Sequence, residues 1–229
     1  MKRLVTILGA GAILLSAFTT SVMAGGFGVG IGIKGIAAES EGTEQMKQSG
    51  KKETTRGENA EGIVPFGYLQ YMINPWGDRN GLVIGVEKIP GDTTLGSKLR
   101  TTTDWQTGDT TAATNVEQLV SAKLEDHIGI YVETPSIGGI FLRGGISQVD
   151  LVTEELLGTG ASYGNQTLDG ESFGIGFRGT SEAGLHVKFI VERTTWDNFN
   201  LTSTGSDAAS TVTGDILTHN ARLSVGFQF

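Results

Sequence analysis

From residue 25 onward the chain repeats one unit, in which about ten residues alternate apolar side chains with small or polar ones. Alternation with a period of two indicates a β-strand whose two faces meet different surroundings. The pattern predicts eight strands, at residues 27–38, 63–72, 81–89, 116–133, 140–149, 170–179, 184–195 and 215–229.

The connections between these strands alternate strictly in length. Short turns are predicted at 74–78, 135–139 and 180–183, and the first of them is marked by its Pro, Gly and Asp residues. Long polar loops are predicted at 39–62, 90–115, 150–169 and 196–214. Short turns at one end and long loops at the other are typical of an outer-membrane barrel. The sequence therefore predicts an all-β protein, a single eight-stranded antiparallel up-and-down transmembrane β-barrel, with a soluble sandwich or lipocalin as the alternative.

The apolar faces of these strands are expected to point outward into lipid. Six positions represent this prediction, one on each of six strands: Leu82, Ile130, Leu142, Ile175, Val187 and Val225. Asp126 interrupts the pattern, because strict alternation places it on the apolar face of its strand. A local β-bulge would accommodate it.

The first 24 residues have the features of an export signal. Lys2 and Arg3 precede an apolar run from Leu4 to Leu15, and Val22-Met23-Ala24 is a small-x-small cleavage site. The predicted domains are therefore a signal peptide at 1–24 and an outer-membrane barrel at 25–229. Removing the signal leaves 205 residues (229 − 24) with 15 Lys and Arg and 25 Asp and Glu, a formal charge of −10.

This acidic balance argues against nucleic-acid binding, which requires a basic surface. The chain has no Cys, so neither a disulfide nor a thiolate metal site is possible. In lipid, a closed ladder of backbone hydrogen bonds would supply the stability instead.

The polar faces of the strands carry charges of both signs, which would lie inside the barrel. The predicted lumen network comprises Lys123, Glu125, His127, Arg143, Arg178, Lys188, Glu192 and Arg222. Charges removed from water must be paired and hydrogen-bonded. An eight-stranded barrel is just wide enough for side chains to fill it, so a plugged scaffold is expected rather than a channel.

The last residues, Arg222 to Phe229, alternate apolar side chains and end in an aromatic residue. They resemble the C-terminal insertion signal of outer-membrane barrels, with Phe227 and Phe229 as the matching positions. The mature chain resembles the opacity-protein and OmpA-like family of eight-stranded barrels. This resemblance implies location in the cell outer membrane and insertion by the barrel assembly machinery, and it implies no catalytic residues.

Other motifs do not change this interpretation. The glycines between Gly26 and Gly32 lie within a strand, so they indicate small residues facing a crowded lumen rather than a phosphate-binding loop. His219, Asp215 and Ser210 form the single local arrangement that an outer-membrane enzyme would use. No metal ligands, catalytic residues or cofactors are predicted.

Three functions remain open at this point. The favoured one is a structural or surface-interaction scaffold, a monomer displaying four extracellular loops and embedded among outer-membrane lipid and lipopolysaccharide. The alternatives are a narrow porin-like channel for small solutes and an outer-membrane enzyme. The sequence does not identify an extracellular partner.

Overall fold

The computed structural model describes residues 25–46, 52–74, 80–104, 113–157, 162–204 and 210–229, so the predicted signal peptide lies outside the described residues. Ten strand segments make up this part of the chain: β1 (Gly25–Met46), β2 (Lys52–Ile73), β3 (Leu82–Lys88), β4 (Asp92–Asp104), β5 (Ala113–Glu133), β6 (Ile140–Leu157), β7 (Gln166–Thr180), β8 (Leu185–Trp196), β9 (Phe199–Thr202) and β10 (Ser210–Gln228). Among the described residues, no helix is long and apolar enough to cross a membrane.

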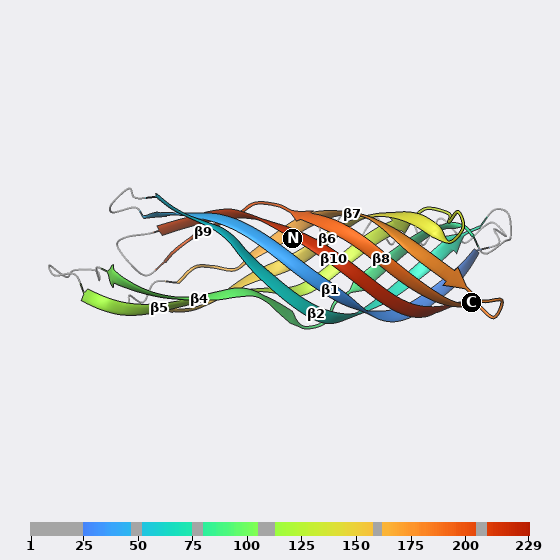
Figure 1. The fold of residues 1–229 in the computed structure, drawn as a ribbon, viewed down its shortest axis with the longest axis horizontal. Coiled ribbons are helices and arrows are strands. Elements are labelled where there is room, and N and C mark those ends of the chain that lie inside the picture. Colours follow the sequence, from blue (N-terminus) through green and yellow to red (C-terminus); the bar gives the residue numbers. More distant parts are fainter. Residues whose placement is uncertain (1–24, 47–51, 75–79, 105–112, 158–161, 205–209) are drawn as a thin grey trace.

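The ten segments form one antiparallel sheet that closes on itself (Figure 1). The order around the ring is β1-β2-β3-β5-β6-β7-β8-β10, and β10 pairs with β1. β4 continues the barrel strand begun by β3, because both pair with β5. β9 continues β8 in the same way, because both pair with β10. The ring therefore has eight strands, which confirms the predicted barrel.

The two ends of the barrel differ. The end that carries the short connections at 134–139 and 181–184, together with the C-terminus, is here called the turn end. There the Phe229 amide donates a hydrogen bond to the Phe27 carbonyl at 2.8 Å, so the first and last strands meet as the even strand count predicts. The opposite end, where β1 finishes at Met46 and β2 begins at Lys52, is called the loop end.

The strands are strongly tilted. A path that starts at Gly179 of β7 and steps from each residue to its partner on the next strand returns to β7 at Asp169 after one turn around the ring. The start and the end of this path differ by ten residues along β7. With eight strands, this displacement corresponds to a tilt of about 40° from the barrel axis. Side chains from strands far apart in the sequence consequently face one another across a narrow lumen.

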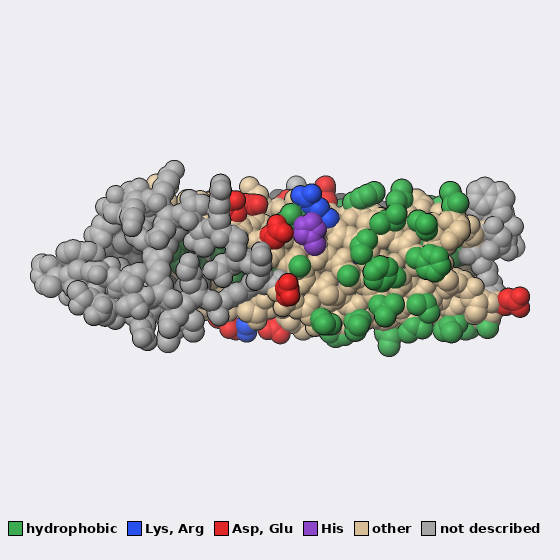
Figure 2. Space-filling view, viewed as in Figure 1, with side chains coloured by type: hydrophobic (Ala, Val, Ile, Leu, Met, Phe, Trp, Pro, Cys, Tyr) green, Lys and Arg blue, Asp and Glu red, His purple; other side chains and the backbone are tan. Residues whose placement is uncertain are grey.

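An apolar belt surrounds the half of the barrel next to the turn end. Of the six positions predicted to face lipid, five are exposed and Ile130 is partly exposed. Figure 2 shows hydrophobic side chains gathered over this half, with acidic, basic and histidine side chains beyond them. Apolar side chains on the outside and charges within are the arrangement expected of a barrel in lipid.

Toward the loop end this arrangement reverses. The inward-facing residues there are apolar and are here called the apolar cluster: Ala38, Leu124, Val149, Leu151, Leu168, Trp196, Leu201 and Ile216. Outward positions on the same segments carry exposed carboxylates, such as Glu39, Glu171 and Asp215. This half of the barrel is thus built like a water-soluble β-barrel.

The long loops predicted from the sequence are therefore wrong in extent. Strands continue into all four stretches: β1 and β2 into 39–62, β4 and β5 into 90–115, β6 and β7 into 150–169, and β9 and β10 into 196–214. Outside lipid, a strand can be polar on its outer face and still bury its inner face. The hydropathy signal expected of a membrane strand is then missing, although the backbone ladder continues.

A β-bulge accommodates Asp126. Glu125 pairs with Asp150 and Ile128 with Gln148, so two residues of β5 oppose one of β6. Asp126 has a φ of 54°, in the left-handed region that Asp tolerates better than most residues. Its carboxylate lies outside the barrel, where it accepts a hydrogen bond from Lys88 at 2.8 Å. The bulge also exchanges the two faces of β5, so that Leu124 is buried inside while Ile128 and Ile130 face outward.

Glycines on β1 make room for large side chains in the lumen. Gly30 pairs with Tyr68 of β2, and a Cβ at position 30 would overlap the Tyr68 ring. Tyr68 in turn is hydrogen-bonded to His186 across the lumen at 2.8 Å. This supports the interpretation of these glycines as small residues in a crowded lumen, because the Tyr68 ring fills the space that a Cβ at position 30 would need.

Gly30→Val is expected to lower the free energy of unfolding by about 1–3 kcal/mol, because Tyr68 must move away from His186. Urea unfolding of the protein refolded in detergent measures this change. Gly67→Val is the matched control, since Gly67 faces outward and a Cβ there meets nothing closer than the Gly30 carbonyl oxygen at 3.9 Å. Equal losses in the two variants would contradict this account of the lumen.

Candidate functional site: the charge cluster of the lumen

Charged side chains converge inside the half of the barrel that the apolar belt surrounds. They are here called the charge cluster: Lys34, Glu87, Glu133, Arg143, Arg178, Lys188, Glu192 and Arg222. Each is 6% exposed or less. The strands alternate, so the positions between their lipid-facing apolar residues necessarily point inward.

Glu133 is the centre of one half of the cluster. Its carboxylate accepts hydrogen bonds from Lys188 at 2.7 Å, from Arg143 at 3.2 Å and from Arg178 at 3.3 Å. These three cations come from β8, β6 and β7, whereas Glu133 comes from β5. One fully buried carboxylate therefore links four strands through charge-assisted hydrogen bonds.

Glu87 and Glu192 organise the other half. Arg222 donates to both carboxylates, and Arg143 donates to Glu87 at 2.5 Å. Lys34 lies 3.7 Å from Glu192. Because β10 and β3 are separated by two strands on the ring, the contact between Arg222 and Glu87 crosses the lumen.

Five cations share three carboxylates in the cluster, and aromatic rings supply additional contacts. The Arg143 guanidinium lies 3.6 Å from the centre of the Tyr131 ring, and the Arg178 guanidinium lies 5.2 Å from that of Phe141. Lys188 is 5.3 Å from the Tyr68 ring centre. Cation–π contacts of this kind stabilise desolvated cations that lack a full set of anions.

Polar side chains border the cluster on the side of the turn end. Gln70 of β2 accepts a hydrogen bond from Lys188 at 2.7 Å, and its amide donates to Gln228 at 3.0 Å. β2 has no member in the charge cluster, so Gln70 joins it to the network. Each of the eight barrel strands thus contributes a side chain to the layer of hydrogen bonds and ion pairs that crosses the lumen.

The structure places six residues of the predicted lumen network inside the barrel and two elsewhere. Arg143, Arg178, Lys188, Glu192 and Arg222 belong to the charge cluster, while His127 is buried beside Trp196 with ring centres 5.8 Å apart.

Lys123 and Glu125 lie on the outer surface, because the bulge at Asp126 exchanges the faces of β5. Lys123 pairs there with Glu154 at 2.7 Å and with Asp92 at 3.5 Å. The hydrogen bond to Glu154 raises the pKa of the Lys123 ammonium group.

Three members of the cluster are missing from the predicted network: Lys34, Glu87 and Glu133. Each follows a lipid-facing apolar residue directly, namely Ile33, Val86 and Val132. The alternation that identifies the lipid face therefore also predicts that these three side chains point into the lumen.

The predicted assembly signal lies at the turn end. Phe227 and Phe229 both face outward, with ring centres 5.2 Å apart in an edge-to-face arrangement. Aromatic side chains in this position are common where a barrel meets the membrane interface.

The enzyme-like arrangement of Ser210, Asp215 and His219 is not a compact site. Asp215 and His219 lie four residues apart on β10, which separates them by about 13 Å along the strand. Among the described residues, no group of three or more His, Asp or Glu side chains is arranged to hold a metal ion.

Comparison with known proteins gives matches in structure alone. No family model and no curated protein sequence matches this chain. The outer membrane protein OprG from Pseudomonas aeruginosa is similar, with a TM-score of 0.54, 10% identity, and coverage of 90% of this chain and 97% of OprG. The outer membrane protein AlkL is similar, with a TM-score of 0.51, 8% identity, and coverage of 92% of this chain and 93% of AlkL.

These likenesses establish the fold and leave the resemblance to the opacity-protein and OmpA-like family as a prediction. The apolar belt independently requires a lipid environment around the barrel. The chain has the fold of the eight-stranded β-barrel proteins of the outer membrane, and that membrane is where it resides.

Proposed function

We propose that this protein is a non-enzymatic scaffold that presents its loop end at the cell surface and whose lumen is closed to solutes. The observation that carries the proposal is the cross-lumen layer formed by the charge cluster and Gln70. The loop end is assigned to the outside because outer-membrane barrels have short turns on the periplasmic side and longer connections on the extracellular side.

Two features of the lumen support closure rather than conduction. Contacts such as those of Glu133 hold side chains from different walls of the barrel in hydrogen-bonding distance of one another. The apolar cluster lies between this layer and the loop end, and apolar side chains oppose the entry of water. Both layers would have to separate before a solute passed.

Planar-bilayer recording tests this proposal against the narrow-channel alternative. The purified native monomer is expected to show no stable conductance steps, because eight strands leave a lumen that side chains fill. Reproducible single-channel steps from the monomer, altered by Arg143→Ala, would contradict closure and favour the channel. An active barrel of known conductance, reconstituted in the same way, controls for insertion.

Assembly and partners complete the proposal. The aromatic C-terminus formed by Phe227 and Phe229 is proposed to serve recognition by the barrel assembly machinery. The protein is proposed to function as a monomer, surrounded by outer-membrane lipid and lipopolysaccharide.

A further inference from the structure

The charge cluster holds more positive than negative side chains. Five cations face three carboxylates, and the two buried histidines, His127 and His186, add no negative charge. A guanidinium remains protonated in proteins, so the three arginines of the cluster cannot lose their charge. Charge removed from water must be compensated, and cation–π contacts compensate it only in part. The charge balance of the described lumen residues therefore favours the binding of an anion.

Each of the three arginines has one buried nitrogen with no hydrogen-bond partner among the described residues. These nitrogens are Nε of Arg143, Nε of Arg222 and Nη2 of Arg178. A buried donor on a charged group is costly when it lacks an acceptor. An anion or a water molecule can serve as the acceptor, and the surroundings of each nitrogen distinguish the two.

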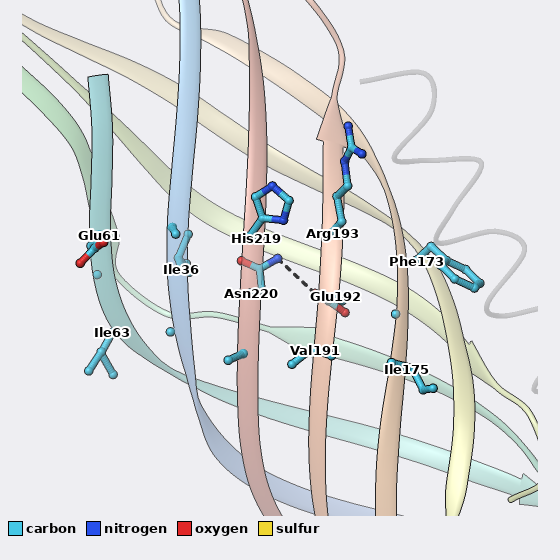
Figure 3. Close-up of a pocket in the computed structure, with 15 residues that line it drawn as sticks. Ile36, Glu61, Ile63, Phe173, Ile175, Val191, Glu192, Arg193, His219 and Asn220 are labelled. Atoms are coloured by element: carbon cyan, nitrogen blue, oxygen red, sulfur yellow. Dashed lines mark hydrogen bonds between the residues drawn. The ribbon is translucent and has the colours of Figure 1, made fainter. Parts of the chain in front are cut away.

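Arg143 and Arg222 lie among unpartnered acceptors. Oε2 of Glu192 and Oδ1 of Asn220 are buried without a hydrogen-bond partner, and the Asn220 amide donates to the other oxygen of Glu192 at 3.4 Å (Figure 3). Nε of Arg143 lies 3.2 Å from Oε2 of Glu192, and Arg222 also donates to Glu192. Water both donates and accepts hydrogen bonds, so it suits this mixed set of groups.

The surroundings of Arg178 are different. Arg178 of β7 is paired directly with Lys188 of β8, both side chains are buried in the lumen, and they share the carboxylate of Glu133 at 3.3 and 2.7 Å. Like charges at directly opposed positions of a sheet repel each other. The unpartnered oxygen of Glu192 lies four residues beyond Lys188 on β8, about 13 Å toward the loop end. Glu182, on the connection that follows β7, is exposed. The unpartnered donor of Arg178 thus lies in a locally cationic part of the lumen.

We propose that the lumen binds one chloride ion at Nη2 of Arg178, with the Lys188 ammonium group beside it. The ion accepts a charge-assisted hydrogen bond from the guanidinium and reduces the repulsion between the two cations. A monatomic ion is assigned because side chains fill the interior of an eight-stranded barrel, which excludes a bulkier anion. Arg178 lies two residues before the end of β7, so the ion enters from the turn end and does not cross the charge cluster.

Thermal unfolding of the purified full-length protein in nonionic detergent tests the proposal. Potassium chloride replaces potassium gluconate at constant ionic strength, because gluconate is too large for the lumen. Chloride at ten times its dissociation constant is expected to raise the Tm of the native protein by about 3–6 °C, since an ion that binds only the folded state stabilises it.

Two variants locate this effect. Arg178→Gln is expected to abolish the rise in Tm. Arg193→Gln is the matched control and is expected to keep the rise, because Arg193 is an exposed cation on the outer face of the barrel. An equal rise in all three proteins would show a general salt effect and overturn the proposal. No rise in the native protein would overturn it as well and assign water to Nη2 of Arg178.

Bromide identifies the ion without relying on a variant that folds. Crystals of the native protein grown in bromide are expected to show an anomalous peak in contact with Arg178. Peaks confined to the outer surface, or no peak, would contradict a lumen site. The proposal goes beyond the proposed function: an ion that binds without passing through leaves the bilayer conductance at zero, so the two experiments can fail independently.

Discussion

Glu133→Gln is expected to lower the free energy of unfolding by about 3–5 kcal/mol, the usual cost of removing one partner from a buried ion cluster. Lys188, Arg143 and Arg178 all donate to this carboxylate, which is fully buried. The amide keeps the shape of the side chain but leaves three desolvated cations without their common anion. Urea unfolding of the protein in detergent, followed by tryptophan fluorescence, measures the loss.

Glu154→Gln is the control for this prediction. Glu154 also accepts a hydrogen bond from a lysine, Lys123, at 2.7 Å, but on the exposed outer surface. A surface pair of this kind contributes about 0–1 kcal/mol. A Glu133→Gln variant no less stable than Glu154→Gln would mean that the charge cluster is hydrated and does not hold the lumen closed.

Val225→Arg is expected to destabilise the folded barrel in a bilayer by about 2–4 kcal/mol, because it places a charge near the middle of the hydrocarbon region. Val225 is the central member of five outward apolar positions that run from Ala221 on β10 to Phe229, the residue that directly follows this strand. Folding into liposomes, titrated with denaturant, gives the difference from the native protein.

Thr213→Arg supplies the matched comparison on the same strand and the same face. Thr213 is exposed beyond the apolar belt, where an added arginine meets water and costs little. If the two variants lost the same stability, the boundary of the belt would have to lie elsewhere on β10.

The fold followed from the sequence because lipid imposes a strict rule on side chains. Every membrane-embedded strand must present apolar residues outward at every second position, and residues such as Leu142, Ile175 and Val225 satisfy this rule. The strand count, the ring closure between Phe27 and Phe229, and the inward direction of Arg143 and Arg222 all follow from this alternation.

This rule does not apply to the part of the barrel that lies outside lipid. Outside lipid, the backbone ladder alone can continue a strand, so β4 and the outer parts of β1 and β2 carry no membrane-type signal. A bulge shifts alternation by one residue without changing the composition of the strand. Strict alternation therefore put Lys123 and Glu125 inside, although Asp126 marked the position of the shift.

The pattern along a single strand also does not show which residues of the charge cluster contact one another. Alternation tells which way Glu87 and Arg222 point, but the ten-residue displacement around the ring decides that they meet. That displacement is a property of all eight pairings together. The sequence supplies the members of such a cluster and the closed sheet supplies its contacts.

The length of β1 and β2 has a consequence for encounters at the cell surface. Each strand has 22 residues, of which about 9–11 suffice to cross the hydrocarbon. At a tilt of about 40°, the remaining half rises about 30 Å beyond the lipid as continuous hydrogen-bonded sheet. With the loop end facing outward, as proposed, a soluble partner that met the end of this sheet would be held at a fixed distance from the bilayer. Such a partner would bind without reaching the lipid headgroups, and no flexible stalk would have to be ordered when it bound.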